Sequence, residues 1–184
     1  MGREYRGQNR AAMSTEQAIR DAADERAIAH ILTRYARAID RFDMELLRTV
    51  YHPDAYDDHG SYKGDVEGFI AFLGEVLPRF EGTQHFLGNM HVELDGDVAH
   101  TETYCQAWHR IAGEDGAPDH DSVAGLRYVD RFERRNGEWR IARRQIVIDW
   151  QRDDPVVGGS GEGSPETRYG RRDRDDPVYH FGRD

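Results

Sequence analysis

The sequence contains a single cysteine, Cys105, among 184 residues, so no disulfide can form within the chain. Disulfides accumulate in oxidising compartments, and their exclusion here favours a cytoplasmic location. Long apolar runs are also missing. The longest, "FIAFLGEVL" at 69–77, is interrupted by Glu75 and falls far short of the roughly 20 residues of a membrane span. The first dozen residues lack an apolar segment, which argues against a secretory signal.

An excess of positive charge is absent as well. The formal net charge is -10, from 25 Lys and Arg against 35 Asp and Glu. Binding to nucleic acid or to an anionic membrane requires clustered basic residues. We therefore expect neither nucleic acid nor a membrane as a partner.

Motifs for a metal or a cofactor are missing too. "HPDAYDDHG" and "PDHD" contain His and Asp, but neither has the spacing of a two-His helical site or of a zinc framework. No glycine-rich loop joins a strand to a helix, as a phosphate-binding loop would. We therefore expect no metal and no cofactor.

The first part of the sequence has the period of amphipathic helices. Ser14 and Gln17 have the spacing of a capping box, so a helix is expected to begin there. Asp43 and Asp65 are placed to cap two further helices, and Pro78 ends the last. The apolar residues of the first helix recur at intervals of four and three, which places them on one helical face. They are Ile28, Leu32, Tyr35, Ile39 and Phe42.

From residue 84 onward the period changes to two, which is typical of strands. Strands are expected over 84–94, 97–111, 122–134 and 138–151, after a short one in "AYDDHGSY". "DGD" at 95–97 and "RNGEW" at 135–139 are hairpin signals, because Asp-Gly and Asn-Gly tolerate a positive φ. Helices followed by an antiparallel meander predict an α+β fold, with the helices on one face of a curved sheet.

The last strand contains two apolar sets in different registers. Trp139 and Ile141 fall on one face by alternation, whereas Arg144 and Trp150 fall on the other. A bulge of one residue near Arg143 would turn Arg144 inward with the first set. A strand buried on both faces near its end is the alternative.

The composition divides the chain into three parts. Residues 1–14 are expected to form a flexible N-terminal extension, 15–151 the α+β domain, and 152–184 an extended tail rich in Gly, Asp and Arg. The tail either wraps its own or a neighbouring subunit, or is mobile. The side chains available for such wrapping are Tyr169, Val178, Tyr179 and Phe181.

Two titratable residues lie in segments that otherwise look like core. Asp40 is at the margin of the apolar stripe of the first helix, and His85 opens the strand in "GTQHFLGNM". Taken singly, they have ordinary interpretations as a solvated helix-end carboxylate and a core histidine bonded to backbone. If the helix lies across the sheet, however, the carboxylate can reach the imidazole, fix its tautomer and raise its basicity. The two residues together therefore predict a general base.

Four stretches carry a resemblance to a known family. "ILTRYARAIDRFDMELLRTVYHPDA", "GTQHFLGNM", "LDGDVAHTETY" and "YVDRFERRNGEWRIARR" resemble the SnoaL-like branch of the nuclear transport factor 2-like superfamily, over residues 16–151. The resemblance implies a cone-shaped α+β barrel of the cystatin-like type, in which a curved mixed sheet wraps around the N-terminal helices and encloses an apolar pocket.

The resemblance also implies site residues. The members most similar to this chain are cofactor-independent lyases, among them scytalone dehydratase, hexachlorocyclohexane dehydrochlorinase and bile acid 7α-dehydratase. Their catalytic Asp–His dyad maps onto Asp40 and His85. A catalytic tyrosine of the bile acid enzyme maps onto Tyr35, and an arginine on the last strand of the dehydrochlorinase maps onto Arg144. Tyr35 has an alternative interpretation as a member of the core stripe.

Further polar side chains are candidates for substrate binding. Asp57 and His59 share a strand face that is expected to point inward, although a histidine exposed in a hairpin is an equally ordinary interpretation of His59. In "HTETYCQAWHR", Tyr104 lies on one face and both Cys105 and His109 lie on the other, so one of these faces should line the pocket. Tyr104 is kept as a candidate substrate contact.

The sequence thus predicts a cofactor-independent lyase of the dehydratase or dehydrohalogenase type, acting on a hydrophobic cyclic small molecule. The alternatives are an isomerase or polyketide-cyclase-type enzyme, a non-catalytic scaffold similar to the small subunit of ring-hydroxylating dioxygenases, and a ligand-binding protein. An apolar sheet face usually needs covering, so a homo-oligomer is expected. The resemblance to the lyases implies a homotrimer, with a homodimer as the alternative.

Overall fold

The computed structural model describes residues 14–114, 116–156, 167–180 and 182 of the chain. The sequence-based expectations for residues 1–13, for residues 157–166 of the tail and for Phe181 fall outside these residues. Within the described part, no helix has the length and apolar character needed to cross a membrane.

Three α-helices form where the sequence places their caps. They are α1 (Thr15–Asp40), α2 (Met44–Val50) and α3 (Val66–Val76), and α3 continues into a 3-10 turn, η1 (Leu77–Arg79). Each helix is capped by a side chain that accepts a hydrogen bond from the backbone two or three residues into the first turn, which satisfies one of the free N–H groups there. The capping residues are Ser14, Asp43 and Asp65, which confirms the three predicted helix starts.

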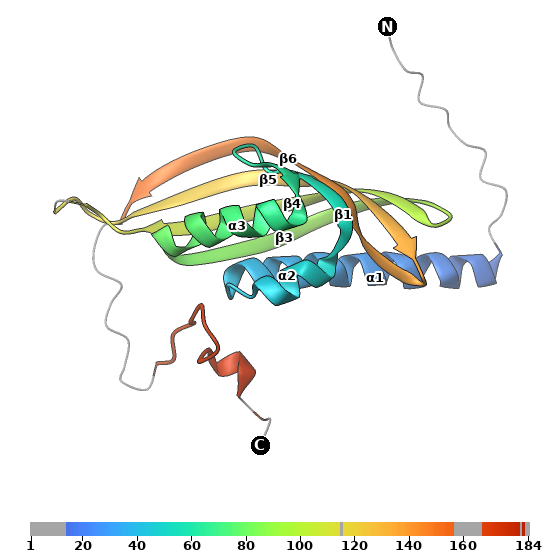
Figure 1. Cartoon of the computed structure of the whole chain (residues 1–184), viewed down its shortest axis with the longest axis horizontal. Coiled ribbons are helices and arrows are strands. Elements are labelled where there is room, and N and C mark those ends of the chain that lie inside the picture. Colours follow the sequence, from blue (N-terminus) through green and yellow to red (C-terminus); the bar gives the residue numbers. More distant parts are fainter. Residues whose placement is uncertain (1–13, 115, 157–166, 181, 183–184) are drawn as a thin grey trace, which may run out of the picture.

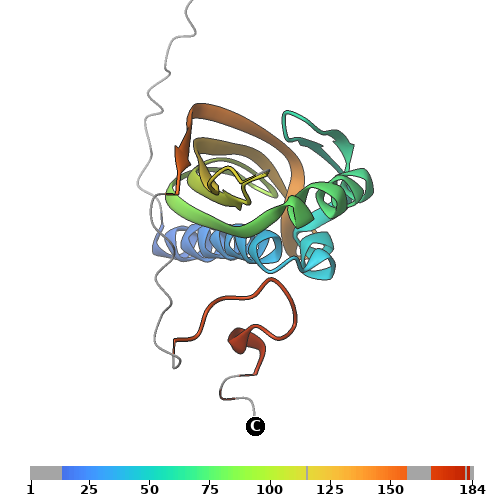
Figure 2. The same ribbon diagram turned by 90° about the vertical axis from the view of Figure 1, so that its left-hand side faces the viewer.

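Six strands form one mixed sheet. They are β1 (Tyr51–Asp58), β2 (Lys63–Asp65), β3 (Phe80–Asp95), β4 (Val98–Ile111), β5 (His120–Arg135) and β6 (Glu138–Pro155), in the order β2-β1-β6-β5-β4-β3. Only the β1–β6 pair is parallel among the pairs in this sheet. The sheet curves over α1 without closing into a barrel (Figures 1 and 2), which confirms the cone-shaped α+β fold.

Several element boundaries differ from the sequence-based expectations. β1 begins at Tyr51, directly after α2, and so includes Pro53. A proline has no N–H to donate, but Pro53 falls in the irregular stretch between Tyr51 and Tyr56 where the pairing with β6 shifts register. The short strand β2 carries no alternation of its own and was not expected. β6 extends to Pro155, beyond the predicted end of the domain at residue 151.

The bulge expected in the last strand is present. Phe132 pairs with Ile141 and the preceding Arg131 pairs with Arg143, so Ala142 is the extra residue. The bulge lets Ile141 and Arg144 both face the interior, where each has 0% exposure.

A second register shift places Asp149 as an extra residue between the partners of Gly125 and Leu126. Trp150 therefore turns to the outer face and is 43% exposed, so the expectation that it shares a face with Arg144 is wrong.

A buried ion pair lies at the centre of the core. The Nε and Nη2 atoms of Arg144 donate to the two carboxylate oxygens of Asp130 at 2.8 and 2.7 Å. The guanidinium is stacked between the rings of Tyr35 and Tyr128, 4.0 and 4.1 Å from their centroids. Burial alone would lower the pKa of Arg144, but the Asp130 carboxylate outweighs this effect and holds the pKa above its usual value.

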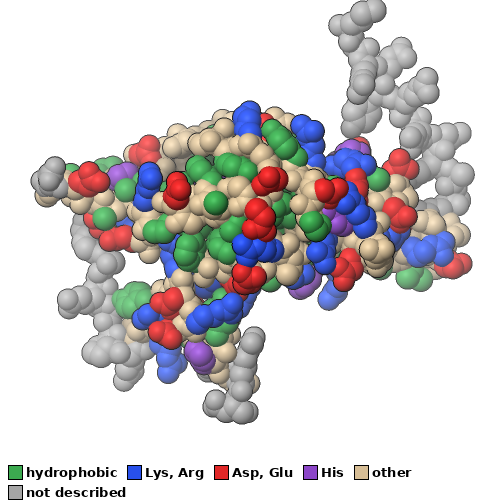
Figure 3. Space-filling view, in the orientation of Figure 1, with side chains coloured by type: hydrophobic (Ala, Val, Ile, Leu, Met, Phe, Trp, Pro, Cys, Tyr) green, Lys and Arg blue, Asp and Glu red, His purple; other side chains and the backbone are tan. Residues whose placement is uncertain are grey.

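The C-terminal segment, residues 167–180, packs against its own chain beneath the C-terminal end of α1 (Figures 1 and 2). Asp176 pairs with Arg41 at 3.4 Å, and Arg174 pairs with Asp43 at 3.2 Å. Charged side chains crowd this segment, whereas apolar side chains gather around α3 on the same face of the molecule (Figure 3). Of the alternatives open for the tail, its described part wraps its own subunit.

The buried pair gives a test of the fold. Arg144→Met leaves the Asp130 carboxylate without its partner in a buried site, so we expect the free energy of unfolding to fall by about 3–5 kcal/mol, measured by urea denaturation. Arg127→Met is the matched control, because Arg127 binds Asp149 with the same two nitrogens at the surface. We expect a much smaller loss from this variant, because solvent screens an exposed ion pair. Equal losses in the two variants would contradict this account of the core.

Candidate active site

The carboxylate of Asp40, the last residue of α1, is bound to β3 by three groups. Oδ1 accepts a hydrogen bond from Thr83 Oγ1 at 3.0 Å, and Oδ2 accepts one from the backbone N–H of His85 at 2.9 Å. His85 Nδ1 lies 2.8 Å from Oδ1. An ionised carboxylate only accepts, so Nδ1 carries the hydrogen in this contact and Nε2 is left with a free lone pair. The structure thus brings together the two residues that the sequence singled out.

His85 lies between two cavities. The inner cavity, of about 330 Å³, is enclosed between α1, α3 and the inner face of the sheet. The outer one, of about 740 Å³, is the mouth of the site and is lined by Asp40, His85, Arg41 and Arg110 together with Arg172 of the C-terminal segment. The walls of the inner cavity are mostly apolar. Its polar side chains include those of Tyr35, His59, His85, His109, Ser122 and Tyr128.

His109 is a second histidine of the inner cavity that the sequence did not single out. Its ring lies 5.5 Å from that of His85, measured between centroids, in an edge-to-face arrangement. Burial, followed by the neighbouring charge of His85, lowers the pKa of His109 to about 4, so the ring is neutral at pH 7. In the sequence, the two-residue period places His109 on the same strand face as Cys105 and opposite Tyr104. This period does not tell which of the two faces points into the core.

Tyr35 and His59 both line the inner cavity, as predicted for substrate contacts. Burial raises the pKa of the Tyr35 hydroxyl, which is therefore protonated and able to donate at neutral pH. Asp57 is fully buried behind them. It accepts a hydrogen bond from Tyr51 at 2.6 Å and lies 2.9 Å from Nδ1 of His59. Asp57 is not among the residues that line either cavity, in contrast to its expected place as a substrate contact.

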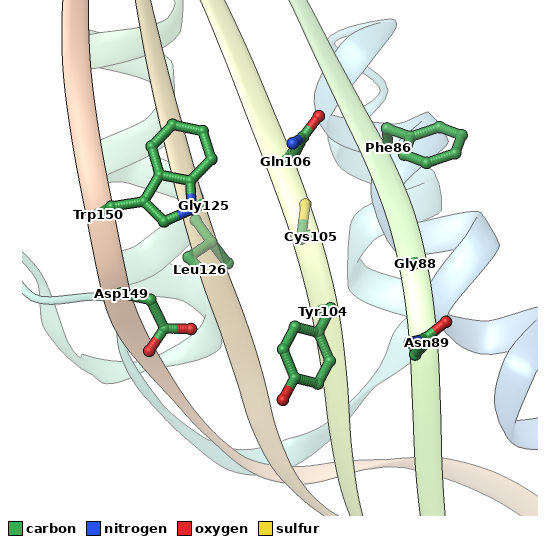
Figure 4. Close-up of a pocket in the computed structure, with 10 residues that line it drawn as sticks. All are labelled: Phe86, Gly88, Asn89, Tyr104, Cys105, Gln106, Gly125, Leu126, Asp149 and Trp150. Atoms are coloured by element: carbon green, nitrogen blue, oxygen red, sulfur yellow. The ribbon is translucent and has the colours of Figure 1, made fainter.

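Two other predicted substrate contacts lie elsewhere. Arg144 is fully buried against Asp130 and is not among the residues that line either cavity, so it reaches the site only through the tyrosine rings stacked on it. Tyr104 lies on the outer face of the sheet, in a groove of about 420 Å³ shared with Phe86 and Trp150 (Figure 4). The prediction that Tyr104 lines the pocket is therefore corrected, because the opposite face of β4 is the one that α1 and α3 cover.

A family model for the SnoaL-like domain matches residues 20–145, more than half of the chain. The chain belongs to the SnoaL-like domain family. A relative in this family, an uncharacterized protein of Mycobacterium tuberculosis (strain H37Rv), is 34% identical over 131 residues, which cover 68% of this chain and 86% of the relative.

Solved structures of other proteins share the fold. A hexachlorocyclohexane dehydrochlorinase of type 2 superposes with a TM-score of 0.70 at 17% identity, covering 80% of this chain and 99% of that one. A scytalone dehydratase-like protein from Novosphingobium aromaticivorans superposes with a TM-score of 0.66 at 20% identity, covering 81% and 99%. At these identities the likeness establishes the nuclear transport factor 2-like, cystatin-like fold of this SnoaL-like chain and leaves its reaction open.

Metal ligands are not clustered in this SnoaL-like domain. Among the described residues, no group of three His, Cys, Asp or Glu side chains lies close enough together to hold a metal ion. The absence of a metal and of a cofactor stays a prediction of the sequence.

The lowered pKa of His109 predicts a loss of stability in acid. The unfolded chain binds this proton near pH 6.5, and the folded protein only near pH 4, so stability falls as the pH drops through this window. Between pH 7 and pH 5, we expect the wild type to lose up to about 2 kcal/mol more of its unfolding free energy than His109→Gln, measured by urea denaturation. His91→Gln, at an exposed histidine of β3, should follow the wild type. An unchanged pH dependence in His109→Gln would show that His109 is charged in the folded protein.

Proposed function

We propose that this protein is a cofactor-independent lyase of the dehydratase or dehydrohalogenase type, in which His85 is the base. The observation that supports this proposal is the 2.8 Å contact between His85 Nδ1 and the Asp40 carboxylate at the edge of a mostly apolar cavity. A histidine whose Nδ1–H is held by a carboxylate presents the lone pair of Nε2 as a general base.

The reaction uses the free lone pair that this tautomer leaves on His85 Nε2. His85 Nε2 takes a proton from a carbon of the substrate next to an activating group. The electron pair of the broken C–H bond forms the new double bond, while a hydroxyl or halide leaves with the electrons of its own bond. Asp40 stabilises the imidazolium that forms, and Thr83 and the His85 N–H hold the carboxylate in place.

Charge that develops on a substrate oxygen needs donors in the inner cavity. The Tyr35 hydroxyl is such a donor, because burial keeps it protonated. His59 gives its Nδ1 hydrogen to Asp57, so its Nε2 is an acceptor in the same cavity. Arg144 contributes by holding the Tyr35 ring at 4.0 Å. Its guanidinium is engaged by Asp130, so the proposal assigns it a positioning role.

A hydrophobic cyclic compound suits this site. The inner cavity of about 330 Å³ falls within the range of small-molecule pockets, and it is lined by apolar side chains with a few polar groups. The folds of a dehydrochlorinase and of a scytalone dehydratase-like protein are shared by this chain and support the same class of reaction. Isomerisation or cyclisation would begin with the same proton abstraction and stays the alternative outcome. A scaffold protein needs no such pair, so we place that function second.

Proton abstraction can be tested before the natural substrate is known. We expect the wild-type protein to accelerate exchange of the α-protons of the cyclic ketone 2-tetralone in D₂O, followed by NMR. His85→Gln and Asp40→Asn should each lower the exchange rate by on the order of 10²–10⁴-fold, because they remove the base and its orienting partner. Tyr104→Phe is the matched control and should exchange at the wild-type rate, since Tyr104 lies outside the cavity. Full exchange by His85→Gln would rule out His85 as the base.

We also propose that the outer face of the sheet joins copies of this chain into a homotrimer, or alternatively a homodimer. This face carries large exposed apolar side chains, among them Phe86 at 66%, Tyr104 at 49% and Trp150 at 43% exposure. Such a contiguous patch is unusual on a surface that stays in water. We propose the cytoplasm as the place where the copies associate.

The association has a direct test. Phe86→Asp places a charge within the patch, so we expect the oligomer to dissociate to monomers in sedimentation velocity experiments. Ile19→Asp is the control, because Ile19 is 65% exposed on α1, away from this face. A wild-type protein that sediments as a monomer would contradict the proposal.

A further inference from the structure

Arg172, in the C-terminal segment, reaches the site from outside the family domain. Its Nη1 atom donates to the backbone carbonyls of Leu77 and Phe80, at 2.9 and 2.7 Å. Leu77 and Phe80 both line the inner cavity, and Arg172 itself lines the mouth together with Asp40 and His85. The guanidinium is thus fixed where the two cavities meet.

The remaining donors of Arg172 have no partner. Its Nε and Nη2 atoms are shielded from solvent and form no hydrogen bond with any described residue. A guanidinium stays charged at neutral pH, and leaving its N–H groups buried and unpaired is costly. The structure therefore contains a cationic site that lacks its acceptor.

The same two atoms show what kind of acceptor is missing. Nε and Nη2 form the fork of the guanidinium that binds a carboxylate through two parallel hydrogen bonds. Among the residues that the structure describes, five other arginines use this fork on both oxygens of an Asp or Glu side chain. They are Arg48, Arg110, Arg127, Arg144 and Arg171.

The carboxylates near Arg172 are already engaged. Asp40 accepts its three hydrogen bonds from β3, Asp121 binds Arg110, and Asp176 pairs with Arg41. Glu81 lines the mouth but is exposed to solvent and does not bond to the fork. No acidic side chain of the described chain satisfies Arg172.

The electrostatic interactions of Arg172 are those expected of a partly buried cation beside both cavities. Burial lowers the pKa of Arg172, and the nearby charge of Asp40 partly offsets the effect. Arg172 in turn contributes to the lowered pKa of His109, on the wall of the inner cavity. The positive charge therefore acts on both the mouth and the interior of the site.

We propose that the Nε and Nη2 fork of Arg172 binds a carboxylate of the substrate, so that the substrate of this protein is a hydrophobic ring compound carrying a carboxylic acid. This inference rests on the proposed function, because it names a substrate group for the same site. The ring occupies the inner cavity beside His85. The carboxylate reaches the fork when a shift of the C-terminal segment uncovers the Nε and Nη2 atoms, which are shielded without substrate. The C-terminal segment thereby contributes a binding residue that the α+β domain does not contain.

The test compares two probes of equal shape, 2-naphthoate and its neutral isostere 2-naphthamide. Binding to the full chain is measured by NMR titration of the ¹³C-labelled histidine rings, so that His85 and His109 report on this site and not on the outer groove. We expect the wild type to prefer 2-naphthoate by about tenfold or more, the size expected for charge-assisted hydrogen bonds. Arg172→Gln should abolish this preference and leave 2-naphthamide affinity within about twofold.

Two variants control for the role of the segment itself. Arg171→Gln changes the adjacent, exposed arginine, which binds Asp173, and should keep the full preference. Arg172→Lys keeps the charge without the fork and should keep only part of the preference for 2-naphthoate. A preference that survives Arg172→Gln, an equal loss of affinity for both probes, or a wild type without preference would each overturn the inference.

The outcome is separable from that of the proposed function. Binding of the probes needs no proton transfer, so the preference for 2-naphthoate should persist in His85→Gln. If it persists while exchange of 2-tetralone protons is unaffected by that substitution, the carboxylate site stands and the lyase proposal fails. If exchange is lost in His85→Gln but Arg172→Gln keeps the preference, the lyase proposal stands and the carboxylate site fails.

Discussion

The carboxylate of Asp40 fixes the geometry on which the site depends. It ends α1 and accepts hydrogen bonds from two residues of β3, Thr83 and His85. A carboxylate that is 14% exposed is costly unless its oxygens are well satisfied, so these contacts hold the end of the helix at one place on the sheet. The same contacts select the tautomer of His85. Helix docking and the chemistry of the histidine are thus consequences of one interaction.

A second buried network keeps the cavity from collapsing at its other end. The Arg144–Asp130 pair and the hydrogen bond from Tyr51 to Asp57 occupy the region behind the cavity with fully satisfied carboxylates. Polar groups in a medium of low dielectric must find their partners, and these requirements specify one arrangement of the strands. The inner cavity has mostly apolar walls and a few polar groups, which is the form expected of a small-molecule site.

The C-terminal segment adds what the family domain lacks. The matched domain ends at residue 145, whereas Arg172 and its neighbours pack on the mouth of the site. Proteins that share this fold carry out different reactions, so differences in specificity are expected to reside in such additions. In this protein, the segment adds the positive charge of Arg172 to an entrance that Asp40, Arg41 and Arg110 also line.

The sequence alone determined the elements and the central pair of the site. Capping residues located all three helices, Asn-Gly and Asp-Gly located the turns, and the conflict of registers in the last strand located the bulge at Ala142 within one residue. These signals are local, because caps, turns and periodicity act over a few residues. The contact of Asp40 with His85 followed from one assumption about how the helix crosses the sheet.

Only the tertiary structure decided which side of each strand is inside. Tyr104 and His109 lie on opposite faces of β4, and alternation cannot choose between them until α1 and α3 cover one face. The partner of Arg144, the turn of Trp150 to the outer face and the docking of Arg172 were equally beyond the sequence. Each depends on residues distant along the chain that meet only when the sheet has curved over the helices. Local patterns carry no information about such contacts.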